Sequence, residues 1–284
     1  MTGTLYLCGL PIGNLEDITL RALRILREAD VILCEDTRHT LKLLNFYEIK
    51  NRLLSYHEHS NAQREEFILG LLQAGQQIAL VSDAGMPLIS DPGYRLVTKV
   101  LAAGFRLEVV PGASAVLASL VLSGFSTEKF SFFGFPPRDR KSEREFMTSL
   151  AAAEYTTVVY ESPHHLYRTL RRMAEFMPGE RPLAIGRELT KKFQEIRRGS
   201  LNEMIDYYAQ TPARGEFTLV VAAAEPNKEV SKDFDDIMTE VRELIAAGQD
   251  KREVLRQTAQ RYHIPKKEIY NSYEKHQVEQ RDQS

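Results

Sequence analysis

The sequence predicts an α/β protein with two α/β domains, the first on a mostly parallel sheet and the second on a mixed sheet, followed by a small helical C-terminal tail. Up to residue 224, short apolar strands alternate with amphipathic helices, and near-continuous apolar strands are typical of parallel sheets covered on both faces. Beyond residue 124 the strands are richer in aromatic and β-branched residues, and some follow one another closely, which favours antiparallel pairing. We therefore expect domains at residues 1–121, 122–225 and 226–284.

The first domain opens with an apolar strand at residues 4–9. The helix after it carries Leu20, Leu23 and Leu26 at three-residue steps, and Asp17 just before it is a good N-cap. The remaining strands of this domain are expected at residues 31–34, 78–81 and 107–110.

The second domain is expected to follow the change of pattern near residue 124. Its strands are predicted at residues 130–133, 156–160, 183–186, 193–198 and 217–221. Residues 225–228 are typical of a linker, and the polar segments 251–261 and 266–276 are expected to be helices. Two helices joined by a short turn, with the second basic, suggest a helix-turn-helix-like arm.

Composition limits the classes of protein to consider. Of the 284 residues, 43% are hydrophobic and 27% are charged, which is ordinary for a globular chain. The net charge of −2 gives no overall attraction to nucleic acid, so RNA binding would need a local basic patch. Cys8 and Cys34 are too few for a disulfide framework and are expected to be buried thiols. Because no apolar run approaches the ~20 residues of a membrane helix, we expect a cytoplasmic protein without a membrane segment.

The loop after the first strand, residues 9–14, has the position of a nucleotide-binding loop but not its sequence. A dinucleotide fingerprint needs three glycines so that backbone N–H groups can approach a pyrophosphate. Pro11 has no N–H to donate, and no third glycine opens the helix. A cofactor held by its phosphates is therefore disfavoured.

Two acidic turns follow the strand at residues 78–81, namely Ser82-Asp83-Ala84-Gly85 and Ser90-Asp91-Pro92-Gly93. In open α/β sheets, ligands bind beyond the carboxyl ends of the strands. Carboxylates there would repel a phosphate but suit a ligand with hydroxyls, an amino group or a cationic centre. A divalent metal on Asp83 and Asp91 is one alternative, although no third ligand follows at a regular spacing. The other is that both aspartates only cap turns and the helix that begins near Pro92.

Two more loops at strand ends carry candidate residues. In Pro111-Gly112-Ala113-Ser114-Ala115, small residues let the backbone approach a ligand closely, although helix capping alone would explain Ser114. Glu35-Asp36-Thr37-Arg38 puts two carboxylates and an arginine in one turn, which suits a general base or a phosphate-bearing substrate. A solvated charged turn is the alternative there. Segments 160–165, 187–192 and 214–218 place further charged groups at the edge of the second domain, where a cleft between domains would lie.

Taken together, these loops resemble the tetrapyrrole-methylase-type S-adenosylmethionine-dependent methyltransferases. The motifs occur in the family's order and are Gly9-x-x-x-Gly13, Ser82-Asp83-Ala84-Gly85-Met86-Pro87, Pro111-Gly112-Ala113-Ser114-Ala115, Arg187-Glu188-Leu189-Thr190-Lys191 and Gly215-Glu216-Phe217. The Glu35-Asp36-Thr37-Arg38 and Ser90-Asp91-Pro92-Gly93 loops look like the branch that methylates a ribose 2′-hydroxyl of a cytidine in the decoding region of bacterial 16S ribosomal RNA. The resemblance covers residues 4 to about 224, and the tail also fits that branch.

The resemblance implies that S-adenosylmethionine lies in the cleft between the two domains, usually in a homodimer, and we expect no metal. The implied cofactor-binding residues are Leu10, Pro11, Ile12, Asp83, Met86, Ser114, Ala115, Glu161 and Thr218. The candidates for the base that assists deprotonation of a weakly nucleophilic ribose hydroxyl are Glu35, Asp36 and Lys191. The residues assigned to the substrate side are Arg38, Asp91, Arg138, Arg140, Lys141 and Arg187.

The expected partner is 16S rRNA, within the 30S subunit, and its affinity would come from basic patches. Residues 136–144 hold four cations against two anions, and residues 251–275 hold seven against three, although a solvated helical face would look the same. One rival activity is methylation of a porphyrinoid carbon, which needs a broad apolar trough and no basic arm. The other is a non-catalytic role in RNA binding or ribosome assembly, against which the intact cofactor loops argue.

Overall fold

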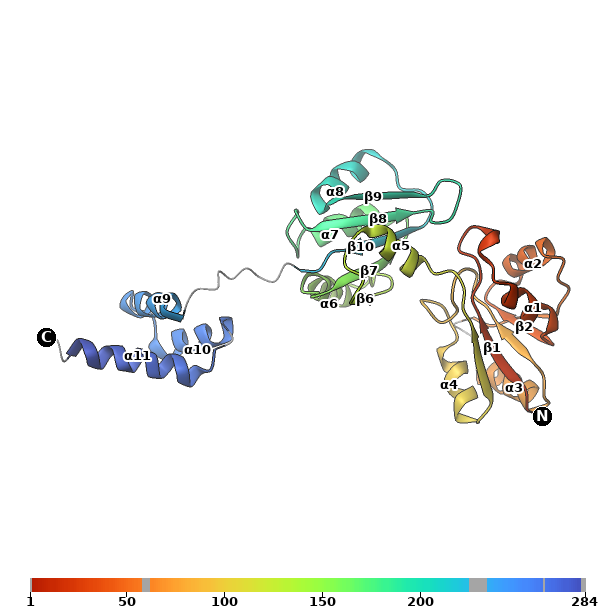
Figure 1. Ribbon diagram of the computed structural model, residues 1–284, viewed down its shortest axis with the longest axis horizontal. Helices are drawn as coiled ribbons and strands as arrows, with labels where there is room; N and C mark the ends of the chain where they lie inside the picture. Colours follow the sequence, from red (N-terminus) through yellow and green to blue (C-terminus); the bar gives the residue numbers. More distant parts are fainter. Residues whose placement is uncertain (1, 58–61, 225–233, 263, 282–284) are drawn as a thin grey trace. The chain divides into compact units, whose positions relative to one another are not determined.

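The computed structural model of the protein describes residues 2–57, 62–224, 234–262 and 264–281 (Figure 1). The chain divides into two compact units, Met1–Ala224 and Glu225–Ser284. The linker expected at residues 225–228 lies outside the described residues. Within the first unit are two sheets with their helices, and the second unit is helical, so the predicted fold class is confirmed.

The first sheet is entirely parallel, as the run of buried apolar strands predicts. Its strand order is β3 (Leu53–Ser55), β2 (Val31–Cys34), β4 (Ile78–Leu80), β1 (Thr4–Cys8), β5 (Arg106–Val110). The edge strand β3 was not predicted, because it is only three residues long and partly exposed. In this order the loops after β1, β2, β4 and β5 all leave from the same end of the sheet.

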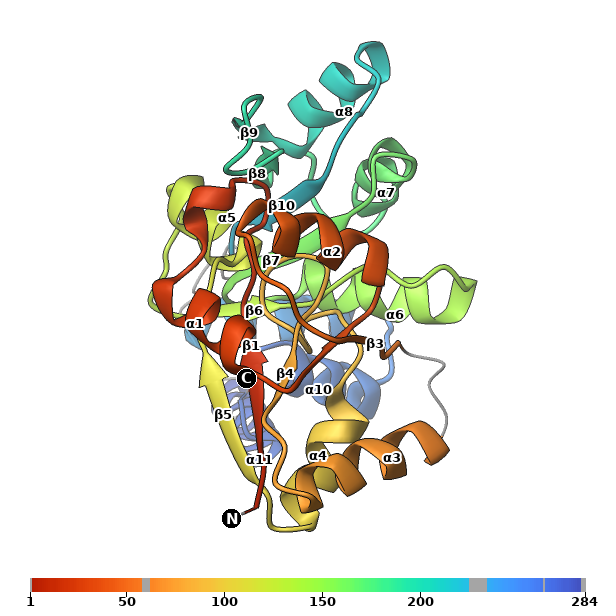
Figure 2. The ribbon, with the colours of Figure 1, turned by 90° about the vertical axis from the view of Figure 1, so that its right-hand side faces the viewer.

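Two pairs of helices cover the faces of this sheet. Helices α1 (Leu20–Glu28) and α2 (Thr37–Phe46) bury apolar side chains against one face, and α3 (Ala62–Gln73) and α4 (Tyr94–Ala102) against the other (Figure 2). The predicted N-cap of α1 is wrong by two positions. Asp17 ends a short 3-10 turn, and the Thr19 side chain accepts the capping hydrogen bond.

The second sheet is mixed and has the strand order β6 (Phe130–Phe132), β7 (Thr156–Glu161), β10 (Phe217–Val221), β8 (Pro182–Arg187), β9 (Glu195–Ser200). Only β6 and β7 are parallel, and the other neighbouring pairs are antiparallel. Helices α6 (Arg140–Ala151), α7 (Leu166–Met173) and α8 (Leu201–Gln210) bury one face. The sequence placed the last-but-one strand two residues too early, because Phe193 belongs to the turn before β9.

Helix α5 (Ala115–Ser123) connects the first sheet to the second within the unit Met1–Ala224, so these two sheets with their helices form its two halves. It follows β5 of the first sheet directly, yet its Val116 and Leu120 pack against Val158, Ala184 and Val220 of the second sheet. The loop before α5 is therefore where the chain crosses from one sheet to the other. The boundary expected near residue 121 falls inside this helix and stays a prediction.

The second unit contains α9 (Phe234–Ala246), α10 (Lys251–Arg261) and α11 (Lys266–Arg281), which share a small apolar core. Some of its cations have partners within the unit, since Lys251 pairs with Glu274 and Arg256 with Glu253. In the described part of the chain, no helix is long and apolar enough to span a membrane.

Candidate functional site

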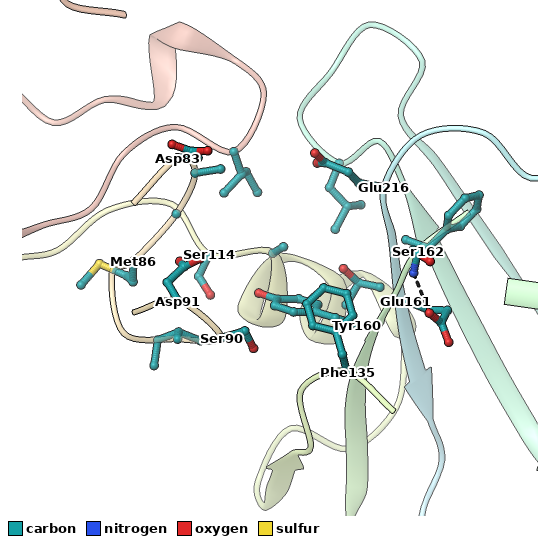
Figure 3. Close-up of a pocket in the computed structure, with 18 of the residues that line it drawn as sticks. Asp83, Met86, Ser90, Asp91, Ser114, Phe135, Tyr160, Glu161, Ser162 and Glu216 are labelled. Carbon is teal, nitrogen blue, oxygen red and sulfur yellow. Dashed lines mark hydrogen bonds between the residues drawn. The ribbon is translucent and has the colours of Figure 1, made fainter. Parts of the chain in front are cut away.

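A cavity of about 370 Å³ lies where the loops at the carboxyl ends of β1, β4 and β5 face β7 and β10 of the second sheet (Figure 3). Seven of the nine predicted cofactor residues line it, together with Asp91: Ile12, Asp83, Met86, Ser114, Ala115, Glu161 and Thr218. This is the crevice in which open α/β sheets hold their ligands. The structure therefore brings these predicted residues together around one cavity.

The loops of the first half are fixed against one another by their backbones. The N–H of Leu10 donates to the Gly85 carbonyl at 2.8 Å, and the N–H of Gly85 donates to the Leu10 carbonyl at 3.1 Å. Gly9 and Gly112 approach so closely that a β-carbon on Gly9 would lie 2.7 Å from the Gly112 nitrogen. Leu10 and Pro11 are buried behind this contact and do not line the cavity, so any role for them is to hold the loop.

The loop from Ser82 to Asp91 forms one wall of the cavity. Leu88 and Ser90 both have positive φ, at 73° and 64°, a conformation that non-glycine residues adopt at a cost. Helix α4 begins after Gly93, without a side-chain hydrogen bond at its N-cap, so the alternative that Asp91 caps this helix is wrong. Asp91 instead lines the cavity beside Ser114.

The electrostatic setting of Asp91 is unusual for an aspartate. Burial is the largest of the causes that raise its pKa to about 6; a hydrogen bond from Ser82 opposes the change, and the carboxylates of Glu35 and Asp83 add to it. Tyr160 is directed from the opposite wall toward the loop of Asp91 (Figure 3). Burial, with the Asp91 charge as the next cause, raises the pKa of Tyr160 to about 12, so its hydroxyl stays protonated.

The loop after β2 holds two of the three predicted bases outside the cavity. Asp36 is the N-cap of α2, where it accepts a hydrogen bond from the Arg38 N–H, and the Arg38 guanidinium folds back onto its carboxylate at 2.8 Å. These hydrogen bonds hold the pKa of Asp36 at about 2. Glu35 is exposed. Arg38 is therefore engaged with Asp36 rather than with the cavity.

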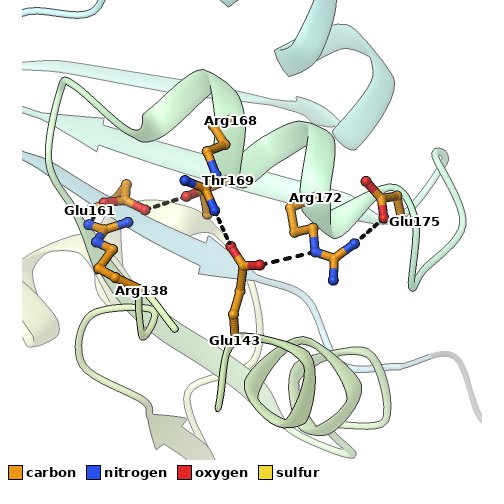
Figure 4. A network of polar contacts seen from close by, with 7 residues as sticks. All are labelled: Arg138, Glu143, Glu161, Arg168, Thr169, Arg172 and Glu175. Atoms are coloured by element: carbon orange, nitrogen blue, oxygen red, sulfur yellow. Dashed lines mark hydrogen bonds and ion pairs between the residues drawn. The ribbon is translucent and has the colours of Figure 1, made fainter. Parts of the chain in front are cut away.

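The carboxylate of Glu161 is held by hydrogen bonds from other residues of the protein. The residue is 2% exposed, and its carboxylate accepts hydrogen bonds from Arg138 at 2.9 Å and from the Thr169 hydroxyl (Figure 4). It also accepts one from the Ser162 N–H at 2.7 Å (Figure 3). Ion pairs from Glu143 tie α6 to the same helix α7 that carries Thr169. The predicted substrate residue Arg138 thus has a structural partner at the edge of the cavity.

Lys191, the third predicted base, lies in the turn between β8 and β9 and bridges two carboxylates. Its Nζ is 2.9 Å from Glu188 and 3.0 Å from Glu216, which lines the cavity. Partial burial lowers the pKa of Lys191, but the hydrogen bonds to both carboxylates outweigh it, so the pKa is raised overall. A charged ammonium cannot accept a proton, so this setting suits charge stabilisation better than base catalysis.

The other predicted substrate residues lie outside the cavity. Arg140 and Lys141 are exposed in the first turn of α6, whose N-cap is Asp139. Arg187 donates to the Arg214 carbonyl at 2.7 Å. The cavity residues that were not predicted include Ile89, Ser90, Phe135, Tyr160, Ser162, Pro163, Leu189, Glu216 and Phe217. Several of these residues are neighbours of predicted residues in the same sequence motifs. The motifs therefore indicated the right loops, but nothing in the sequence singled out these individual side chains.

Residues 4–205 match the sequence profile of the family described as Tetrapyrrole (Corrin/Porphyrin) Methylases. The chain belongs to the tetrapyrrole methylase family. The resemblance of the loop motifs is therefore confirmed, and S-adenosylmethionine, the predicted methyl donor, is the cofactor of this family. In the described residues, no group of three or more His, Cys, Asp or Glu side chains is placed to hold a metal ion.

Within this family the chain is similar to proteins that carry the name ribosomal RNA small subunit methyltransferase I. The one from Halalkalibacterium halodurans is 43% identical over 274 residues, which cover 95% of this chain and 94% of the relative. The one from Thermotoga maritima is 47% identical over 223 residues, which cover 78% of this chain and 100% of the relative. The latter therefore matches over its whole length while about a fifth of this chain has no counterpart in it.

Solved tetrapyrrole methylase structures share the fold. A cobalt precorrin-4 methyltransferase superposes with a TM-score of 0.60 at 19% identity, covering 78% of this chain and 96% of its own. A uroporphyrin-III C-methyltransferase from Thermus thermophilus, in complex with S-adenosyl homocysteine, gives 0.56 at 20% identity, with coverage of 78% and 97%. At these identities the comparison shows the two-sheet architecture and no more.

Proposed function

We propose that the protein transfers a methyl group from S-adenosylmethionine to the ribose 2′-hydroxyl of a cytidine in the decoding region of 16S ribosomal RNA. The observation that carries the proposal is the 43% identity to a ribosomal RNA methyltransferase over 95% of the chain, which extends beyond the residues of the cavity-bearing unit. We further propose that it acts as a homodimer, in the cytoplasm, on the 30S subunit.

The cavity wall offers the groups that this cofactor needs. Asp83 presents carboxylate oxygens suited to hydroxyl or amino groups, and Ser114 and Thr218 add hydroxyls. Ile12 and Met86 add apolar surface for an adenine or a methionine chain. The first loop has no run of N–H groups for a phosphate, and S-adenosylmethionine carries none. When bound, the cofactor supplies an electrophilic methyl group on a sulfonium.

The chain's own contribution is to orient the acceptor. Displacement at a methyl carbon needs the attacking oxygen in line with the bond that breaks, so holding both partners in a fixed geometry supplies much of the rate. The Leu10–Gly85 backbone pair and the Glu161 hydrogen bonds keep the two walls rigid for this purpose. The sequence predicts Glu35, Asp36 or Lys191 as the base. In the structure Glu35 is exposed, Asp36 is a helix cap and Lys191 is held between two carboxylates.

The RNA would be held by exposed cations near the cavity. Arg140, Lys141 and Arg144 lie on α6, which follows the Arg138 that contacts Glu161. Arg171 is exposed on α7, the neighbouring helix. Contacts of this kind to RNA phosphates give affinity that falls steeply with salt. The target nucleotide must also leave its stack before its ribose can enter a cavity of this size.

The test is transfer of tritiated methyl groups from S-adenosylmethionine to 30S subunits from a strain that lacks the modification. We expect label in the 16S rRNA of these subunits and none in subunits that already carry the methyl group. Asp83→Ala should abolish transfer together with the calorimetric heat of cofactor binding. If the wild-type protein binds the cofactor but labels a porphyrinoid and no RNA, the proposed substrate is wrong.

A further inference from the structure

We propose that Asp91 is the general base of the reaction and accepts the proton of the acceptor hydroxyl. This inference rests on the proposed function and changes the role expected from the sequence, where Asp91 was assigned only to substrate binding. It replaces Glu35, Asp36 and Lys191 as candidates for the base.

Asp91 has the right position for this role. It lines the cavity from the loop after β4, and Ser114 and Tyr160 line the same cavity from the start of α5 and from β7 (Figure 3). It does not cap the helix that follows it, because the N-cap of α4 is Gly93. The positive φ of Ser90 fixes the backbone immediately before it. A side chain held in this way can meet a hydroxyl inside the cavity.

The charged and titratable groups that face Asp91 include no cation among those described and two carboxylates that raise its pKa. Glu35 approaches from the loop after β2, Asp83 from its own loop and Tyr160 from β7. None of the described groups that set its pKa is a cation. Burial is the largest cause that raises the pKa of Asp91 to about 6, and the charges of Glu35 and Asp83 add to it, so the group is ionised at pH 7 yet much more basic than a solvated aspartate.

The other carboxylates of the cavity are either held by protein partners or already assigned to the cofactor. Glu161 accepts three hydrogen bonds from within the protein, and Glu216 pairs with Lys191. Asp83 accepts one long hydrogen bond, from the Asp36 N–H at 3.4 Å, and is the carboxylate proposed above to bind the cofactor. Asp36 itself is a helix cap with a pKa of about 2. Among the cavity carboxylates, Asp91 is therefore the one with neither an ion pair in the described residues nor a role proposed for the cofactor, which leaves it for the substrate proton.

The step balances as a single displacement. The hydroxyl oxygen forms the new O–CH₃ bond while the S–CH₃ bond breaks and its electron pair stays on the sulfur, which becomes neutral. The hydroxyl proton passes to the Asp91 carboxylate, which becomes a neutral acid and then releases the proton to solvent. No oxidant, reductant or metal is required.

The test is the pH dependence of single-turnover methyl transfer by the full chain to unmodified 30S subunits. For the wild-type protein we expect a rate that rises with pH up to about 6 and is flat above it. Asp91→Asn should lower the single-turnover rate at least a hundredfold and remove the inflection, while the calorimetric affinity for S-adenosylmethionine changes less than about threefold. Asp206→Asn, at an exposed position on α8, is the matched control and should match the wild type in rate and profile.

The outcomes separate this inference from the proposed function. If the wild-type protein methylates RNA and Asp91→Asn keeps its rate, or loses only cofactor or RNA affinity, Asp91 is not the base. If the wild-type protein transfers no methyl group to RNA, the inference and the proposed function are both overturned. A wild-type profile that is flat from pH 5 to 8 also overturns the inference, and this measurement needs no variant.

Discussion

The side chain of Lys191 lies directly over Gly13, so that a β-carbon added at position 13 would stand 2.3 Å from Lys191 Cγ. Gly13 belongs to the loop after β1, and Lys191 to the turn between β8 and β9, so the contact joins the two halves of the cavity-bearing unit. Lys191 Nζ then reaches Glu216 at the cavity wall. Gly13 is therefore needed so that the aliphatic side chain of Lys191 can pack closely on the first loop, and not so that the loop can bind a phosphate.

Gly13→Ala should move the β8–β9 turn away from the first loop, because the new methyl group overlaps the lysine stem. We expect cofactor affinity to fall about tenfold, which corresponds to about 1.4 kcal/mol. The measurement is calorimetric titration with S-adenosylmethionine. Gly70→Ala is the control, since Gly70 lies in helix α3 with nothing within 4 Å of an added β-carbon, and it should be neutral or slightly stabilising. Equal affinities for both variants would contradict this role of Gly13.

Lys191→Met should destabilise the cavity-bearing unit by about 1 kcal/mol at pH 7, because two carboxylates lose their cation. Burial raises the pKa of Glu188, but its hydrogen bonds outweigh burial and lower the pKa overall. The contribution of Glu188 to stability is therefore present above its unfolded pKa of 4.5 and is lost as the pH falls. The pKa of Lys191 is raised in the folded protein, so its contribution to stability is complete below its unfolded pKa of 10.5 and is lost as the pH rises above that value. Thermal unfolding should therefore show a smaller effect of the substitution at pH 3.5 than at pH 7, and an effect independent of pH would show that the ion pairs are not responsible.

Glu161→Ala should cost about 2 kcal/mol of stability, because it leaves the Thr169 hydroxyl and the Arg138 guanidinium without their acceptor. The half-exposed arginine can regain water, which keeps the loss below that of a fully buried pair. Thr169→Val removes one of the three hydrogen bonds and should cost about 1 kcal/mol. Denaturant unfolding of both variants checks the order, and a larger loss for the threonine variant would be inconsistent with a network centred on Glu161.

The sequence predicted the architecture well because its signals are local and repeated. The strands β1, β2 and β4 are short apolar runs, and a side chain such as Leu5 or Ile78, in a sheet that helices cover on both sides, can only be apolar. The loops that follow them carry the motifs. Asp83 and Ser114 were therefore found at the cavity from their position after a strand.

Other features depend on neighbours that sequence patterns do not encode. Nothing in the run around Glu161 shows that Arg138 and Thr169 occupy its carboxylate, since these residues meet only in the folded chain. The bridge from Lys191 to Glu216, which lies 25 residues further along the chain, likewise forms only in the folded protein. Identical residue types at strand ends thus have different roles, and the fold decides which of them face the cavity.

Truncation after residue 224 should leave cofactor binding intact and weaken binding to 30S subunits. The cavity lies entirely within Met1–Ala224, and the Thermotoga maritima relative matches over 223 residues that make up its full length. Calorimetry with S-adenosylmethionine and filter binding to 30S subunits measure the two effects. Loss of cofactor binding on truncation would show that the helical unit contributes to the site.

Arg140→Ala combined with Lys141→Ala should weaken 30S binding and make the affinity less dependent on salt, by about one unit of slope for each phosphate that the protein no longer neutralises. Cofactor affinity should not change, because neither side chain lines the cavity. Filter binding between about 50 and 200 mM salt measures the slope. Lys50→Ala, at an exposed position after α2, is the control, and an equal decrease in affinity for this variant would indicate only an effect of net charge.

The measurement that tests the proposed activity most directly is the position of the transferred methyl group. After reaction with unmodified 30S subunits, the 16S rRNA is digested to nucleosides and the methylated nucleoside is identified by mass spectrometry. We expect a cytidine methylated on its ribose, released as a nuclease-resistant dinucleotide before complete digestion. A methyl group on the base, or on no nucleoside while the cofactor is consumed, would contradict the proposed function.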